Sequence, residues 1–539
     1  MKITFIGATH QVTGSRTLVE WNPGRYFLVD EGMEQGEIKY EQAGLPVPAS
    51  QIDSVFITHA HIDHTGMLPL LIKEGFRGSI YATEETVNLC SIMLADSAQI
   101  QEADAAHETK KNLRTGKEAV LPLYTSEDVA ETMKHFIPCV YHQLIMIDDG
   151  LTVRFSDAGH LLGSSFIEFF LTEDGITKKL VCSGDVGNLN QPIIRDPEPM
   201  PDCDYLLIES TYGTRNHEAA SEPIPVLVEL LRKTFARGGT VLIPSFAVGR
   251  TQELLYFFRE IKQHQLLPEY PEFPVYVDSP LANEATAIFL QCSPECLDED
   301  ALAIMNQGNN PIWFDGLHTT VSSDESKALN TNTQPKVIIA SGGMCEGGRI
   351  RHHLKHNLWN PNNLILFAGY QAAGTLGRII YDGAQSVKIF GEEIDVKAEI
   401  QLLPGVSGHA DRKGLLAWVK SAGNKPKCVF VDHGDDESCE GLSDALRENY
   451  GLEAMAPYSG SEYDLLKGEW VRLTMPVLKK QNNSSQPAAD VSAPAKKKAM
   501  VYQELLNAFD KLNDYIISMK EASNNDIRQL TEKIHRLMD

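Results

Sequence analysis

Several things are missing from this sequence. It has no run of about 18 or more apolar residues, so no transmembrane helix and no membrane partner are expected. The first residues, MKITFIGATHQVTG, carry one lysine and only a short apolar run, which is typical of a first β-strand and not of a signal peptide. Cysteine is scarce, with nine residues and no CxxC pair. We therefore expect reduced thiols in a cytoplasmic protein, without a zinc ribbon or a disulfide framework.

Positive charge is also in deficit. The 48 Lys and Arg residues are outnumbered by 73 Asp and Glu residues, and the formal net charge is -25. This balance counts against a simple nucleic-acid binder, which usually shows a basic footprint. A nucleic-acid substrate stays open for two reasons: bound divalent metals would neutralise site carboxylates, and net charge does not describe local patches.

Apolar residues are plentiful enough for large cores. Hydrophobic types make up 42% of the 539 residues, which predicts more than one domain. Over residues 1–209, short β-like runs end in clusters of Gly, Asp and His, a pattern that suits an α/β or sandwich architecture. Over 210–393, helical segments alternate with strands, which predicts a separate α/β unit with parallel strands. The first pattern returns over 394–475.

The C-terminal part differs from the rest. Residues 476–500 are polar and aperiodic, which predicts a flexible linker. Residues 501–539 place apolar side chains at heptad spacing, which predicts an amphipathic helix. This helix is expected to form a coiled coil or to bind a partner, so a homodimer or other self-association is expected. The alternative is a helix packed back on its own domain.

The segment HAHIDHTG concentrates metal-ligand residue types directly after the apolar run SVFIT. It supplies His59, His61, Asp63 and His64. Residues two apart in an extended segment point the same way, so His59 and His61 can hold one ion, and a turn can direct the other two side chains at a second ion. Imidazole and carboxylate ligands suit a catalytic zinc, with manganese as the competitor. The alternative is a chance cluster of surface or core histidines.

Further candidates end later apolar runs. His160 stands in DAGHLLGSS, Asp185 in CSGDVGN and His433 in VFVDHGD. Each alone suits a ligand or a hydrogen-bonded core group equally well, but together with the first motif they predict one shared rim. Asp30, which ends YFLVD, is expected to accept a hydrogen bond from a ligand histidine or from the motif loop. The alternative for Asp30 is an ordinary strand-end turn.

HxHxDH followed by a lone His and then an Asp resembles the metallo-β-lactamase superfamily. The resemblance implies an α/β fold, an αββα sandwich that holds two metals at its strand ends. The implied ligands are His59, His61 and His160 for the first metal, Asp63, His64 and His433 for the second, and Asp185 as the bridge. The implied cofactors are two Zn²⁺ per chain, with Mn²⁺ as an alternative.

Later motifs resemble the β-CASP nucleases of that superfamily, such as the nuclease subunit of the polyadenylation cleavage factor. IESTYG places Glu209 after the first half of the sandwich, while GVSGHAD and VDHGD place His409 and His433 at the family's later signatures. The insert between Glu209 and about 394 matches the cap domain of the family. The resemblance covers roughly residues 1–475 and does not extend to the C-terminal part.

The resemblance implies a ribonuclease that cuts single-stranded RNA endonucleolytically, with 5′ exonuclease activity as an option. Phosphodiester hydrolysis needs an activated water, charge neutralisation on the phosphate, and a proton for the leaving alkoxide. Two metals, with Asp63 and Asp185 among their ligands, would supply the first two. His409, oriented by Glu209, would donate the proton. The expected products are a 5′-phosphate and a 3′-hydroxyl.

Two other classes of function remain at this point. A small-molecule metallohydrolase of the same superfamily, acting on thioesters or lactones, would give Glu209 and His409 no role. An inactive RNA-binding scaffold would be expected to lack metal ligands, whereas this chain keeps all of them. DNA is a less favoured substrate, although nothing in the sequence reads the 2′-hydroxyl.

The most basic local run is SGGMCEGGRIRHHLKH at 341–356. Its glycines let the backbone approach a phosphate, and the helix start that follows offers free N–H groups. The expected RNA contacts are Ser341, Gly342, Gly343, Arg349 and His352, together with Arg250 and Thr251 after PSFAVG. Such contacts give little sequence specificity. The alternative is a solvated helix face preceded by a tight turn.

Overall fold

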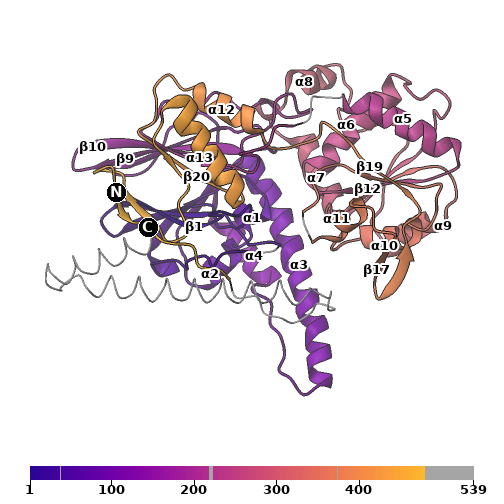
Figure 1. The fold of residues 1–539 in the computed structure, drawn as a ribbon, viewed down its shortest axis with the longest axis horizontal. Helices are drawn as coiled ribbons and strands as arrows, with labels where there is room; N and C mark the ends of the chain where they lie inside the picture. The colour runs from indigo at the N-terminus through magenta and orange to yellow at the C-terminus, as the bar shows by residue number, and fades with distance from the viewer. Residues whose placement is uncertain (37, 218–221, 373, 480–539) are drawn as a thin grey trace, which may run out of the picture. The chain divides into compact units, whose positions relative to one another are not determined.

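The computed structural model describes residues 1–36, 38–217, 222–372 and 374–479. Residues 1–479 form one compact unit (Figure 1). Of the linker expected at 476–500, residues 480–500 lie outside the described residues, as does the helix expected at 501–539. Residues 476–479 are described, and Leu478 forms an antiparallel bridge with Tyr40. Nowhere in the described ranges is a helix both long and apolar enough to cross a membrane.

The first sheet joins the N-terminal strand to strands from near residue 470. Its strands, in sheet order, are β23 (Glu469–Arg472), β22 (Glu462–Asp464), β1 (Lys2–Gly7), β2 (Arg16–Asn22), β3 (Arg25–Val29), β4 (Ile52–Phe56), β5 (Ser79–Thr83) and β6 (Phe136–Cys139). The strands from β3 to β6 run parallel. The loops after β3 and β4 therefore emerge at the same edge.

The second sheet has seven strands. In sheet order they are β21 (Ala454–Met455), β20 (Cys428–Asp432), β11 (Tyr205–Glu209), β10 (Ile176–Cys182), β9 (Ser165–Glu173), β8 (Leu151–Asp157) and β7 (Ile145–Asp148). β10, β11 and β20 are parallel, and β8 and β10 each pair antiparallel with β9. The C-terminal ends of β8, β10, β11 and β20 consequently share one edge.

The two sheets pack face to face through aromatic side chains. The ring of Phe27 in the first sheet stacks on Phe169 in the second, with centroids 4.7 Å apart. Phe5 of the first sheet and Phe430 of the second are in tilted contact, with ring centroids 5.0 Å apart. The strands β11 (YLLIE) and β20 (CVFVD) are buried along their whole length. This is expected of parallel strands that are covered on both faces.

Helices close the outer faces of the sandwich. Trp418 of α12 and Leu442 of α13 pack in one cluster with Leu206 and Val429 of the second sheet. The long helix α3 contacts β5 and β6 of the first sheet. The layers are thus helix, sheet, sheet and helix, and the expected αββα sandwich is confirmed (Figure 1).

The described helices, in chain order, are α1 (Ile62–Thr65), α2 (Leu68–Lys73), α3 (Glu84–Arg114), α4 (Ser126–Thr132), α5 (Pro223–Ala236), α6 (Arg250–Gln263), α7 (Pro280–Gln291), α8 (Glu299–Asn306), α9 (Ser323–Thr331), α10 (Ile350–Asn357), α11 (Leu376–Tyr381), α12 (Arg412–Lys420) and α13 (Asp436–Tyr450). Short 3₁₀ turns lie at Ala49–Gln51, Met133–His135 and Pro294–Cys296.

The chain segment that connects β11 to β20 forms a third sheet. Its order is β14 (Leu317–Thr319), β13 (Val275–Asp278), β15 (Val337–Ser341), β12 (Val241–Ser245), β16 (Leu364–Phe367) and β19 (Glu399–Leu402). Every pairing in it is parallel, as the alternation of helices and strands predicted. A separate hairpin pairs β17 (Ser386–Ile389) with β18 (Glu392–Asp395). The domain boundary expected at 393 falls before β19, which still belongs to this sheet.

The insertion leaves its two flanking strands side by side. β11 and β20 are neighbours in the second sheet, with Glu209 opposite Asp432. The chain therefore leaves the sandwich at Glu209, builds the third sheet and returns next to the strand that it left. This connection places the loop after β20 beside the loop after β11.

Candidate metal centre

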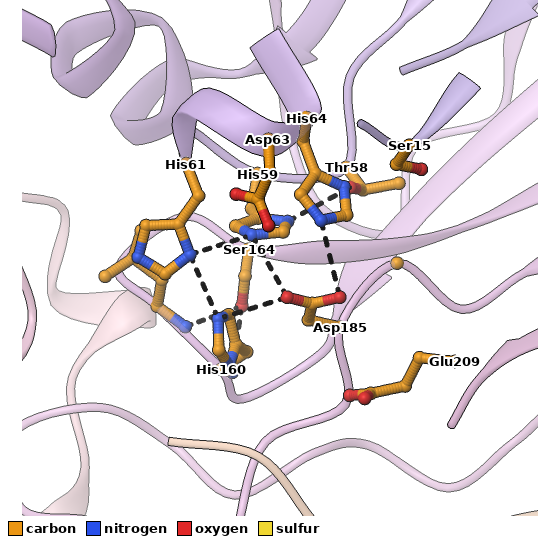
Figure 2. A network of polar contacts seen from close by, with 12 residues as sticks. Ser15, Thr58, His59, His61, Asp63, His64, His160, Ser164, Asp185 and Glu209 are labelled. Atoms are coloured by element: carbon orange, nitrogen blue, oxygen red, sulfur yellow. Dashed lines mark hydrogen bonds and ion pairs between the residues drawn. The ribbon is translucent and has the colours of Figure 1, made fainter. Parts of the chain in front are cut away.

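The loops at the shared sheet edges carry every predicted metal ligand. His59 follows β4, and the short helix α1 presents Asp63 and His64. In the second sheet, His160 follows β8, Asp185 follows β10 and His433 follows β20. Figure 2 shows the imidazoles of His59, His61 and His160 converging on the Asp185 carboxylate.

The first group consists of His59, His61, His160 and Asp185. His59 Nε2 lies 3.0 Å from His61 Nδ1, and His160 Nε2 lies 3.3 Å from the same His61 nitrogen. The Asp185 Oδ2 atom is 3.5 Å from both His59 Nε2 and His160 Nε2. Ligand atoms around a tetrahedral zinc, bound at about 2.0–2.2 Å, lie roughly 3.3–3.6 Å apart. The spacing therefore matches one ion.

The second group consists of Asp63, His64 and His433. The Nε2 atoms of His64 and His433 are 3.1 Å apart. Asp63 Oδ2 lies 3.7 Å from His433 Nε2. The other carboxylate oxygen of Asp185, Oδ1, lies 3.5 Å from His64 Nε2. Asp185 thus offers one oxygen to each group, which is the arrangement expected of a bridging ligand.

The cluster meets the requirements of a cation site. The buried Oδ1 of Asp185 has no hydrogen-bond partner among the described residues. Burial alone lowers the pKa of His64, but Asp185 and Asp30 raise it overall to about 9. The pKa of His433 behaves alike: burial lowers it, and the carboxylates of Asp185 and Asp63 raise it to about 10. The carboxylates therefore favour positive charge around His64 and His433. Burial lowers the pKa of His59, His61 and His160, which favours the neutral imidazoles that bind metal. The His/Asp cluster is thus able to bind metal.

Asp30 holds His64 in place from the next strand. Its Oδ2 accepts a hydrogen bond from His64 Nδ1 at 2.7 Å, which leaves Nε2 free to face the centre. Its Oδ1 accepts the backbone N–H of Thr58 at 2.8 Å. On the other side, His160 Nδ1 donates to the Gly408 carbonyl oxygen at 3.0 Å. Carboxylates and carbonyls in such positions fix the orientation of ligand rings.

The backbone around the centre is tightly constrained. Asp30 and His433 adopt positive φ angles of 58° and 49°, a conformation that non-glycine residues keep only where the surroundings enforce it. A Cβ on Gly187 would lie 1.7 Å from the Gly159 carbonyl oxygen. The Asp185 loop and the His160 loop can therefore approach so closely only because residue 187 is glycine.

Glu209 and His409 form a pair beside the cluster. Glu209 Oε1 accepts the backbone N–H of Val186 at 2.7 Å and a hydrogen bond from His409 Nδ1 at 3.2 Å. His409 Nδ1 is also 3.9 Å from Asp185 Oδ2, and its ring packs against His160 with centroids 4.5 Å apart. Burial would lower the pKa of His409, but Glu209 and Asp185 raise it overall.

Comparison with known proteins assigns this arrangement to a family. Residues 18–178 match a metallo-β-lactamase superfamily domain. Residues 251–380 match the Beta-Casp domain, and residues 393–457 match a Zn-dependent metallo-hydrolase RNA specificity domain. Ribonuclease TTHA0252 of Thermus thermophilus is 38% identical over 447 residues, which cover 83% of this chain and 96% of that protein.

The chain belongs to the β-CASP nucleases of the metallo-β-lactamase superfamily. The transcription termination factor FttA of Methanosarcina mazei is 33% identical over 469 residues, covering 85% of this chain and 70% of that protein. FttA of Pyrococcus abyssi is 31% identical over 477 residues with the same coverage. The family resemblance and the fold expected from it are confirmed.

In this β-CASP nuclease, the residues predicted to contact RNA occupy different environments. Ser341, Gly342 and Gly343 form the turn at the C-terminal end of β15. Arg349 is bound by Asp278 at 2.5 Å, so its guanidinium is partly occupied within the cap. His352 stacks on Phe390, with centroids 4.5 Å apart. Their contact with RNA stays a prediction.

The other two residues predicted to contact RNA, Arg250 and Thr251, also bind groups within the protein. Arg250 forms a short ion pair with Glu253 on the same helix. Thr251 is buried, and its hydroxyl donates to the Phe246 carbonyl oxygen at 2.6 Å. Both residues shape the loop after β12, and direct contact of either with RNA is likewise a prediction.

Sequence reasoning missed the carbonyl of Gly408 and the hydroxyl of Thr58. The Thr58 hydroxyl donates to Asp30 at 2.9 Å. Its position directly before His59 was a usable signal, because a residue next to a ligand is well placed to orient it. The Gly408 carbonyl left no signal, because any residue has one.

Proposed function

We propose that this nuclease hydrolyses phosphodiester bonds in single-stranded RNA in a metal-dependent reaction, cutting endonucleolytically and in addition exonucleolytically from the 5′ end. The observation that carries the proposal is the Glu209–His409 pair, held at 3.2 Å beside the carboxylate that joins the two ligand groups. The match to an RNA specificity domain and the ribonuclease relative support RNA over the small-molecule thioester or lactone alternative.

The metal site is proposed to hold two Zn²⁺, with Mn²⁺ as the alternative. His59, His61 and His160 would hold one ion, Asp63, His64 and His433 the other, and Asp185 would bridge them. When bound, two such cations activate a water and stabilise negative charge on a phosphate. The mixed nitrogen and oxygen donors fit a catalytic zinc better than a structural one.

His409 is proposed to protonate the leaving oxygen. Its Nδ1 donates to Glu209, and its Nε2 has no hydrogen-bond partner among the described residues. Because the carboxylates raise the pKa of His409, the protonated ring is favoured, as a general acid requires. Glu209 orients the ring and is itself held by the backbone N–H of Val186.

The test uses purified full-length protein with 5′-labelled and internally labelled single-stranded RNA, with and without added zinc or manganese. Cleavage that needs metal and disappears in His64→Ala and His409→Ala supports the proposal. Cleavage of thioesters or lactones with the RNA left intact would contradict it. Internal fragments separate endonucleolytic from exonucleolytic cutting.

We also propose the domain boundaries, the location and the self-association of the protein. We assign the sandwich to 1–209 and 394–475 and the cap to 210–393, with β19 beyond residue 393 contributing a strand to the cap sheet, and we assign the protein to the cytoplasm. A homodimer or other self-association, formed through the expected C-terminal helix, is tested by light scattering on the full-length chain. A monomer at micromolar concentration would count against self-association.

A further inference from the structure

Two aromatic rings stand exposed at the C-terminal edge of the third sheet. Phe246 directly follows β12, and Tyr370 follows β16; each is 51% exposed. Neither ring stacks on another aromatic side chain in the described part of the chain. In parallel sheets this edge is where ligands bind. Isolated exposed rings are common on proteins, but these two lie on neighbouring loops at the same end of the sheet.

The two rings flank the same glycine-rich turn. Three carbons of the Phe246 ring lie 3.1–3.3 Å from where a Cβ on Gly343 would stand. The buried amide of Gln371 donates to the carbonyl oxygens of both Gly343 and Tyr370, at 3.1 Å each. These contacts hold the loops after β12, β15 and β16 together. Phe246 lies on the loop after β12, and Tyr370 lies on the loop after β16.

The same loops adjoin the metal centre. A Cβ on Gly249, three residues after Phe246, would lie 3.0 Å from Cδ1 of Leu161, the neighbour of His160. Burial raises the pKa of Tyr212, and Tyr370 contributes to the rise through space. The Tyr212 ring is 6.2 Å from the ring of His409. The loop that carries Phe246 thus lies against the His160 loop, and the loop of Tyr370 is joined to the same turn through Gln371 and Gly343.

The basic side chains of Arg349 and Arg250 near this turn already bind acceptors within the protein. Arg349 is bound to Asp278 and to the Val321 carbonyl oxygen, and Arg250 is paired with Glu253. Affinity for a nucleic-acid strand therefore needs another source. Stacking of bases on aromatic rings is such a source and depends little on base identity.

We propose that Phe246 and Tyr370 stack on unpaired bases of the RNA strand bound at the metal centre. The inference rests on the proposed ribonuclease function and adds how the strand is held. A duplex keeps its bases stacked on each other and offers none to the rings. The two side chains therefore favour single strands with little sequence preference.

The first experiment measures KM and kcat of the full-length, zinc-loaded protein on labelled single-stranded RNA. Phe246→Ala and Tyr370→Ala should each raise KM by roughly 5- to 100-fold, with kcat changed far less. Phe246→Trp and Tyr370→Phe keep a ring and should restore KM. The matched control is Trp313→Ala: Trp313 is 49% exposed but precedes β14, at the opposite edge of the sheet.

A second experiment separates stacking from a structural effect. Each variant is tested on RNAs that carry one abasic nucleotide at successive positions around the cut. Where a ring stacks on the missing base, the Ala substitution should cost almost nothing further. Independent, additive losses at every position, or a KM within twofold of wild type, would overturn the inference. Wild-type protein that cuts no RNA would instead overturn the proposed function.

Discussion

At the scale of single residues, the Glu209–His409 pair has a measurable electrostatic consequence. The acid form of His409 is present below its pKa, and Glu209 raises that pKa. Glu209→Gln removes this charge, so the pKa of His409 falls and the acid form is lost at lower pH. The alkaline limb of the pH profile of kcat/KM should move to lower pH. An unshifted limb would show that His409 is not the titrating acid.

His409→Ala removes the side chain that is proposed to protonate the leaving oxygen. Loss of a general acid typically costs about 10²–10⁴-fold in rate. The metal content should stay at the wild-type level, because none of the ligands is altered. Activity assays and elemental analysis of the same preparation check both parts. A parallel loss of metal would mean that His409 serves the metal site instead.

Asp30 is expected to act only through His64. Asp30→Asn keeps the shape but weakens the hydrogen bond to His64 Nδ1, and loss of such a partner typically lowers metal affinity about 10- to 100-fold. Competition with a chromophoric chelator measures the change. Asp324→Asn is the matched control, because Asp324 is an exposed side chain that pairs with Lys327 on α9. Equal affinity in both variants would contradict the role given to Asp30.

At the scale of elements, the close approach of two loops depends on Gly187. A side chain there would meet the Gly159 carbonyl oxygen, so Gly187→Ala must separate the Asp185 loop from the His160 loop. We expect reduced metal content and activity, with the far-ultraviolet circular dichroism unchanged. Gly44→Ala is the control, since nothing lies within 4 Å of a Cβ at that position. Wild-type metal content in Gly187→Ala would refute the expectation.

The sequence predicted these elements well where apolar runs were unambiguous. The candidate ligands His59, His160, Asp185 and His433 were predictable as a cluster because each follows an apolar run that ends as a buried part of a strand. The pairing of Arg349 with Asp278 escaped prediction, because it joins residues 71 positions apart and neither has a local signature. The pairing of β19 with β16 also escaped prediction, because the two strands lie on opposite sides of the expected boundary and no local pattern links them.

At the scale of the whole molecule, the metal centre ties together distant parts of the chain. Ligands that bind only the folded state stabilise it by mass action, by about 2.7 kcal/mol when the free ligand is at 100 times its Kd. Removal of metal by a chelator should therefore lower Tm, and adding zinc back should restore it. His59→Ala combined with His64→Ala should unfold at the same temperature with and without chelator. Equal Tm values for wild type in both conditions would argue against a metal held by the folded protein.

The order of these residues along the chain has a consequence during translation. His409 and His433 are made only after the entire cap, and both lie beside Asp185 in the folded protein. Because a chain emerges from the ribosome N-terminus first, a nascent polypeptide that ends before residue 409 lacks both the proposed general acid and the last proposed metal ligand. Under the proposed roles of His409 and His433, the protein is therefore expected to cut RNA only after both residues have left the ribosome.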